Sequence, residues 1–208
     1  MKRFFLILFL SPFCLVFSQK LKFDIMAQYS ISNENSTFER SCYGISSNDN
    51  YLMQIINQYD GQQVAKVYDL KSLKSHEFII TESKSENDIK NYEFTYSKTL
   101  AFERKIAGNV YFDFQSVSII ENIETVKLSL YKNKSKTKII NSFELKIIKS
   151  ELNLFPLFRF TCLHPSEFIT ELSYAGSGLV TNCTSENGLK NYTLKTFEEA
   201  NIELTIPN

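Results

Sequence analysis

Apolar and polar residues alternate along most of the chain, and the first alternating segment is the longest. Its apolar positions share one parity and are Leu21, Phe23, Ile25, Ala27, Tyr29 and Ile31, with polar residues between most of them. Successive side chains on a strand point to opposite faces, so a period of two buries one face and leaves the other in solvent. The pattern therefore predicts a long, half-buried strand at this position.

A hairpin is predicted next. The segments 51–59 and 64–68 both alternate, and Asp60-Gly61 lies between them. An Asp-Gly pair favours a two-residue hairpin turn in which both residues have positive φ. We therefore predict that Asp60 and Gly61 form a tight turn between two strands.

Short alternating segments continue to the end of the chain, at 78–80, 92–96, 110–114, 126–130, 139–147, 179–183, 192–196 and 202–206. In the segment 152–163 apolar residues occupy both parities, which predicts a strand covered on both faces and kinked at Pro156. Only Pro165–Ser173 has the pattern of a short helix, and a strand fits it almost as well. About eleven strands predict an all-β fold, with at most one short helix, built as a single antiparallel and strongly curved sheet, a half-barrel or a two-sheet sandwich.

The N-terminal residues have the composition of a cleavable export signal. Lys2 and Arg3 precede an apolar run over 4–17, and Val16 and Ser18 are small residues ahead of a cleavage site. The run has about 14 residues, fewer than the roughly 20 that span a membrane. We predict cleavage after Ser18, export to the periplasm or the extracellular space, and a single β-rich domain over 19–208 that does not span the membrane. A lipid on Cys14 and an uncleaved anchor are the alternatives.

Charge argues against nucleic acid as a partner. The chain has 23 basic and 23 acidic residues, and removal of residues 1–18 leaves 21 basic residues against 23 acidic ones. Nucleic-acid-binding proteins concentrate basic residues on one face, whereas the charges here are dispersed.

Three cysteines remain after the predicted cleavage, namely Cys42, Cys162 and Cys183. An odd number in an oxidising compartment indicates one disulfide and one free thiol, or a disulfide between two molecules. Our preferred pair is Cys162 with Cys183, because closing a loop of about 20 residues stabilises the fold by roughly 3 kcal/mol. The alternative is that all three are small, buried apolar residues.

No catalytic or metal-binding pattern is present in the sequence. His164 lies two residues after Cys162, but no protease-like sequence surrounds that pair, and two histidines with scattered cysteines lack the spacing of a zinc site. The carboxylates at Glu198-Glu199 and at Glu121 with Glu124 could act as an acid and base pair only if the fold held them about 5–10 Å apart. We expect no catalytic residue, no cofactor and no metal.

Two features favour binding. Aromatic residues crowd the central segments, and we predict that Phe112, Phe114, Phe158 and Phe160 line an apolar cavity within the curved sheet. The alternative is that they fill a packed core, as most such aromatic residues do. Lys132, Lys134, Lys136 and Lys138 lie on one side of a predicted hairpin tip. They either attract an anionic partner or keep the end of the hairpin soluble.

The long first strand and the curved sheet are similar to the folds of periplasmic lipoprotein carriers, and the chain resembles exported β-rich proteins of two-membrane bacteria. The resemblance concerns the fold and implies no residue roles. We expect an exported, non-enzymatic domain that binds a lipid-like or other apolar ligand, or a protein of the cell envelope. A secreted hydrolase that uses dispersed Asp and Glu is one alternative, and a structural surface protein is another.

Overall fold

The computed structural model describes residues 18–84, 90–102 and 110–207. Within these residues the chain forms eleven strands and one helix. The strands are β1 (Gln19–Asn33), β2 (Thr37–Ile45), β3 (Asn48–Asn57), β4 (Gln63–Asp69), β5 (Lys74–Lys84), β6 (Lys90–Ala101), β7 (Tyr111–Ile120), β8 (Ile123–Tyr131), β9 (Ile139–Lys149), β10 (Gly178–Ser185) and β11 (Lys190–Ile206), and the helix is α1 (Phe155–Cys162). The predicted signal peptide and Cys14 lie outside the described residues, except for Ser18.

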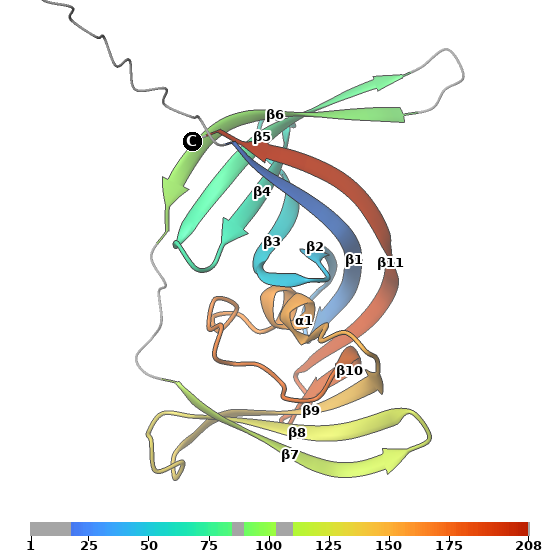
Figure 1. Cartoon of the computed structure of the whole chain (residues 1–208). Coiled ribbons are helices and arrows are strands. Elements are labelled where there is room, and N and C mark those ends of the chain that lie inside the picture. The colour runs from blue at the N-terminus through green and yellow to red at the C-terminus, as the bar shows by residue number, and fades with distance from the viewer. Residues whose placement is uncertain (1–17, 85–89, 103–109, 208) are drawn as a thin grey trace, which may run out of the picture.

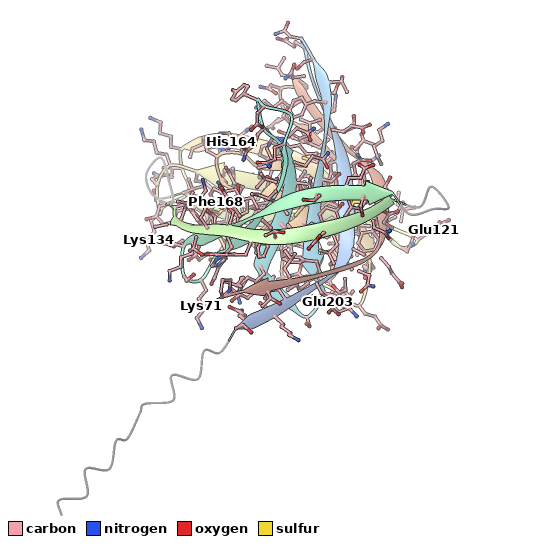
Figure 2. All side chains as sticks on the ribbon, turned by 90° about the horizontal axis from the view of Figure 1, so that it is seen from above. Lys71, Glu121, Lys134, His164, Phe168 and Glu203 are labelled. Carbon is pink, nitrogen blue, oxygen red and sulfur yellow. The ribbon has the colours of Figure 1, made fainter. Side chains whose placement is uncertain are left out.

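The strands form one antiparallel sheet in the order β6-β5-β4-β3-β2-β1-β11-β10-β9-β8-β7. The first and last strands pair at its centre, and β6 and β7 are its edges. The sheet curves strongly around α1 (Figure 1). In the view from above, Lys134 and His164 lie on one side of the molecule and Glu121 lies on the opposite side (Figure 2). The predicted all-β fold with a single curved antiparallel sheet is confirmed.

The burial of β1 follows the predicted alternation. The six apolar positions named above are buried, and most of the residues between them are partly or fully exposed. This single buried face contacts two cores. The buried residues from Ile25 to Ile31 belong to the larger core, which includes α1, whereas Leu21 and Phe23 pack with Met53, Val67 and Phe78 in a smaller core.

Two β-bulges bend β11 along its pairing with β1. Phe23 pairs with Ile202 and Ile25 with Glu199, so β11 has one extra residue there, and a second extra residue follows between Thr196 and Leu194. A bulge adds a residue to one strand and bends it. The segments 192–196 and 202–206, which the alternation predicted as separate strands, are therefore one continuous strand whose parity shifts twice.

The hairpin of β3 and β4 is confirmed, but its predicted two-residue turn is wrong. The Gln58 N–H donates to the Gln62 carbonyl at 2.8 Å, and the Gly61 N–H donates to the Gln58 carbonyl at 3.0 Å. These bonds enclose a three-residue loop in which Gly61 has φ +84°. A turn followed by one left-handed residue needs glycine only at that last position. Asp60 instead accepts a hydrogen bond from the Gln62 N–H through Oδ1 at 3.0 Å.

The helix forms where a kinked strand was predicted. All eight residues of α1 are buried, and Pro156 lies in its first turn, where a helix needs no N–H donor. A helix that is buried all round has apolar residues on every side, which gives the same two-parity pattern as a doubly covered strand. The other candidate helix, Pro165–Ser173, is neither helix nor strand. It forms successive turns, in which the Ile169 N–H donates to the Ser166 carbonyl and the Leu172 N–H donates to the Ile169 carbonyl.

The helix and the turns that follow it fill the concave side of the sheet. The Tyr29 hydroxyl donates to the Val180 carbonyl at 2.8 Å, and its ring lies 5.6 Å from that of Phe158. The buried Arg159 donates through Nη1 to the carbonyls of Thr170 and Leu172 at 3.1 and 3.0 Å. These bonds fix the turn segment against the helix, so the space beneath the central strands is a packed core.

Candidate ligand groove

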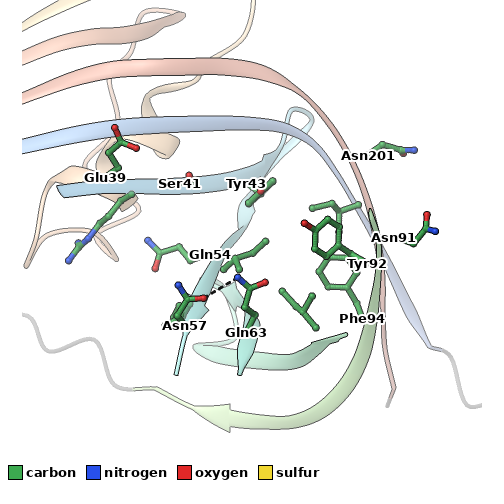
Figure 3. A pocket seen from close by; sticks show the side chains of 15 residues that line it. Glu39, Ser41, Tyr43, Gln54, Asn57, Gln63, Asn91, Tyr92, Phe94 and Asn201 are labelled. Atoms are coloured by element: carbon green, nitrogen blue, oxygen red, sulfur yellow. Dashed lines mark hydrogen bonds between the residues drawn. The ribbon is translucent and has the colours of Figure 1, made fainter. Parts of the chain in front are cut away.

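A groove of about 950 Å³ lies between β2–β6 and β11 (Figure 3). Seven of its described lining residues are apolar or aromatic, namely Tyr43, Ile55, Ile56, Ile80, Tyr92, Phe94 and Ile202. The remaining eight are Glu39, Arg40, Ser41, Gln54, Asn57, Gln63, Asn91 and Asn201. The groove therefore offers an apolar surface and a largely uncharged polar surface side by side.

Strand register places three of the apolar residues, Ile80, Tyr92 and Phe94, on one face of the β5–β6 pair, which forms the floor of the groove. Ile80 of β5 pairs directly with Phe94 of β6, and Tyr92 lies two residues before Phe94 on the same face. Ile80 is buried in the smaller core, and Phe94 and Ile202 pack against that core. Tyr92 is 50% exposed and Ile55 is 37% exposed, so the floor continues outward from the core to solvent.

The polar residues of the groove are mostly amides. The Gln63 side chain donates through Nε2 to Oδ1 of Asn57 at 3.1 Å across the β3–β4 pair. Burial, and then the nearby Glu198, raise the pKa of the Tyr43 hydroxyl, so this group stays protonated at neutral pH and remains a hydrogen-bond donor. Glu39 and Arg40 add one charge of each sign from β2.

The four predicted cavity-lining phenylalanines lie in the other half of the molecule. Phe158 and Phe160 are 0% and 4% exposed within α1, and the rings of Phe158 and Phe155 lie 5.9 Å apart. Phe112 and Phe114 of β7 are partly buried, and Phe114 contacts Phe155 at 5.4 Å. Phe160 packs instead on Tyr68 and Phe168, and none of the four predicted residues is among the described residues of the groove.

The three cysteines are free and buried, so the predicted disulfide between Cys162 and Cys183 is not formed in this structure. Cys162 ends α1 and Cys183 belongs to β10, and both lie in the larger core. Burial raises the pKa of Cys42 to about 12 and raises the pKa of the other two thiols as well. Thiols held protonated in an apolar core are poor nucleophiles and poor metal ligands.

The histidines do not form a site with these thiols. Nδ1 of the exposed His164 lies 2.7 Å from Oε1 of Glu167. His76 is buried on β5, with Nδ1 at 2.7 Å from the Thr99 hydroxyl. Within the described residues no group of His, Cys, Asp and Glu is arranged to hold a metal ion.

The carboxylates singled out in the sequence have structural partners or lie in solvent. Glu124 accepts a hydrogen bond from the Tyr174 hydroxyl at 2.7 Å, and bonds from Ser116 and Tyr174 lower its pKa. Glu121 lies in the β7–β8 turn with φ 55°. Among the described residues that line the groove, Glu39 is the one carboxylate.

Sequence reasoning assigned the strands of the groove but missed the groove itself. The adjacent pair Ile55-Ile56 was the available signal, because two neighbouring apolar residues on a half-buried strand cannot both face one core. In the structure Ile55 and Ile56 are 37% and 39% exposed. Both residues line the groove, so such a pair indicates apolar surface that the core on the buried face of the strand does not cover.

No protein-family model and no curated protein matches this chain. Among the described residues no helix is long and apolar enough to cross a membrane. Function is therefore inferred from the chemistry of the groove.

Proposed function

We propose that this chain is an exported, non-enzymatic binding protein that holds an elongated, uncharged amphipathic ligand in the groove between β2–β6 and β11. The observation that carries the proposal is the division of the lining into an apolar floor and an amide-rich polar wall. Its volume of about 950 Å³ lies within the range of small-molecule sites.

The two surfaces make separate contributions to affinity. Each Å² of apolar ligand surface covered by Ile80, Phe94 and Ile202 contributes about 25 cal/mol. The side-chain amides can both donate and accept hydrogen bonds, so they satisfy hydroxyl or ester groups without a charged partner. A monoacylglycerol has this combination of an acyl chain and an uncharged, hydroxylated head.

The lining favours binding over the hydrolase alternative. Glycoside hydrolysis uses two carboxyl groups on opposite sides of the scissile bond. Glu39 is the one carboxylate among the described lining residues, which include neither the buried thiols nor His76. The chemistry of the groove therefore supports holding a ligand rather than cleaving one.

The proposal is tested by fluorescence of N-phenyl-1-naphthylamine bound to the purified protein and displaced by monopalmitoylglycerol. Ile55→Lys places an ammonium group at the apolar floor, and we expect about tenfold weaker binding or more. Ile119→Lys is the matched control, because Ile119 is an exposed strand isoleucine on β7, far from the groove in the sheet order.

A second pair of variants guards against loss of folding. Tyr92→Asn removes an exposed ring of the groove, and Tyr59→Asn removes an exposed ring of the β3–β4 loop. We expect only the first of these to weaken binding, with unchanged circular dichroism for both. Equal affinity in the groove variants and their controls, or no displaceable probe in the wild type, would overturn the proposal.

A further inference from the structure

The hairpin tip between β8 and β9 is held in one conformation by Asn133. Its Oδ1 accepts hydrogen bonds from the N–H groups of Thr137 and Lys138, both at 3.1 Å. Its Nδ2 donates to the hydroxyls of Ser135 and Thr137 at 2.8 and 2.7 Å. The Lys132 N–H also donates to the Lys138 carbonyl at 2.9 Å, which closes the loop. The tip therefore presents its side chains from a fixed backbone.

Four lysines project from this tip and all are exposed. Lys136 pairs with Asp113 at 3.0 Å, whereas the ion pairs of the described residues include none of Lys132, Lys134 and Lys138. Glu167, in the turns after α1, lies 2.7 Å from His164. The tip thus retains a local charge of about +3, although the chain as a whole is neutral.

Apolar surface adjoins these charges. Ile139 and Ile140 follow the last lysine directly and are 56% and 54% exposed. Ile140 also lines a hollow of about 160 Å³ with Leu130, Leu163 and Pro165, between the hairpin and the turns after α1. Lys134 and His164 lie on the same side of the molecule, as does Lys71 of the β4–β5 turn (Figure 2). Basic and apolar groups therefore face solvent together along one side.

We propose that the lysine tip, defined as residues 132–140, docks the protein on an anionic lipid bilayer. Lysines attract headgroup phosphates, and the exposed isoleucines enter the boundary between headgroups and acyl chains. An anionic polysaccharide would satisfy the lysines but offers no apolar phase to Ile139 and Ile140. Lysines that only kept the hairpin tip soluble would gain nothing from exposed isoleucines beside them. The combination of lysines and isoleucines therefore favours docking on a bilayer.

The test measures binding of the purified protein to vesicles of phosphatidylcholine and phosphatidylglycerol in a ratio of about 7:3. The triple variant Lys132→Gln, Lys134→Gln, Lys138→Gln leaves the Lys136–Asp113 pair in place. At about fivefold per lysine, we expect roughly 100-fold weaker binding. The control Lys20→Gln, Lys22→Gln, Lys195→Gln makes the same charge change at exposed positions of β1 and β11, and should bind within about threefold of the wild type.

Two further measurements separate the roles of charge and apolar contact. Raising the salt concentration from about 0.05 M to about 0.5 M shortens the Debye length about threefold and should release the wild type. Ile139→Ser should weaken vesicle binding about threefold or more, because it removes apolar contact with the bilayer. Binding of this variant at low salt should still require phosphatidylglycerol, because its lysines are unchanged.

Absence of wild-type binding to the mixed vesicles at low salt would overturn the proposal. So would equal binding to pure phosphatidylcholine, or equal losses in the two triple variants. Binding to a soluble anionic polysaccharide without binding to vesicles would assign the tip to that partner instead. Each outcome is independent of ligand binding in the groove, because the two sites lie in opposite halves of the sheet.

Discussion

At the scale of single residues, partly and fully buried polar groups of this protein are stabilised by particular partners. Asp24 illustrates this. Burial alone would raise the pKa of its carboxyl, but hydrogen bonds from the Ser46 N–H at 2.7 Å and from the Ser46 hydroxyl at 2.6 Å outweigh that effect and lower it. In His76 the effect of burial outweighs the nearby Asp69 carboxylate, so the pKa of the imidazole is lowered and the neutral form is favoured.

The first prediction concerns the pH dependence that His76 causes. Because its pKa is lower in the folded state than the usual value of 6.5, the unfolded chain binds more protons in this range. The free energy of unfolding should therefore fall as pH decreases through about 6.5, and level off below the folded-state pKa. Urea titrations at several pH values measure this slope.

Substitution identifies the group responsible. His76→Gln should remove the slope near neutral pH, whereas His164→Gln, at a side chain that is 74% exposed, should leave it in place. The depressed carboxyl pKa values of Asp24 and Glu124 act in a more acidic window, where stability is lost on protonation. A slope that persists in His76→Gln would contradict this assignment.

At the scale of elements, the contact between β2 and α1 depends on a missing side chain. A Cβ atom built on Gly44 would lie 2.8 Å from Cδ2 of Leu157 and 3.4 Å from the Ile25 side chain. Gly44 therefore lets the helix approach the sheet closely. Glycine within a strand often marks a site of such close approach.

The second prediction follows from that contact. Gly44→Ala should lower the free energy of unfolding by about 1–3 kcal/mol through overpacking. Leu157→Ala should cost about 2–5 kcal/mol through the cavity it leaves. In the double variant the new methyl group occupies part of that cavity, so the combined loss should be smaller than the sum. Additive losses in urea denaturation would show that the two residues are not in contact.

Strands were predictable from this sequence to a greater extent than the helix or the groove. The alternation in β1 holds over six apolar positions, and the period of two identified the buried face correctly. In α1 the eight residues give barely two turns, and burial on all sides removes the helical period, so Pro156 was assigned to a kink rather than to a first turn. The groove brings residues of β2–β6 together with Asn201 and Ile202 of β11, which the sheet order separates from β6, and no local pattern encodes that approach.

At the scale of the whole molecule, β1 and β11 connect the two cores. Phe158 lies in the larger core and Phe78 in the smaller one, and both cores include residues of these two strands. If one half unfolded alone, part of the β1–β11 pairing would be broken. The backbone N–H and carbonyl groups of the strand that remained folded would then lose their partners. The two halves should therefore unfold together.

The third prediction tests this coupling. Phe78→Leu and Phe158→Leu should each lower the free energy of unfolding by about 1–2 kcal/mol and shift one common transition, seen alike by tyrosine fluorescence and circular dichroism. Phe197→Leu, at a ring that is 39% exposed, should change it by less than about 0.5 kcal/mol. Two separate transitions in either core variant would show that the halves unfold independently.

The two bulges of β11 have a consequence for the shape of the protein. Between the pairs Gln19–Ile206 and Asn33–Lys190, β11 contains two more residues than β1, which amounts to about 7 Å of additional contour length. Two strands that are joined side by side but differ in contour length must follow arcs of different radius. Sheet curvature is thus encoded in a residue count, and a deletion at either bulge would be expected to widen the angle between the two halves without altering any core side chain.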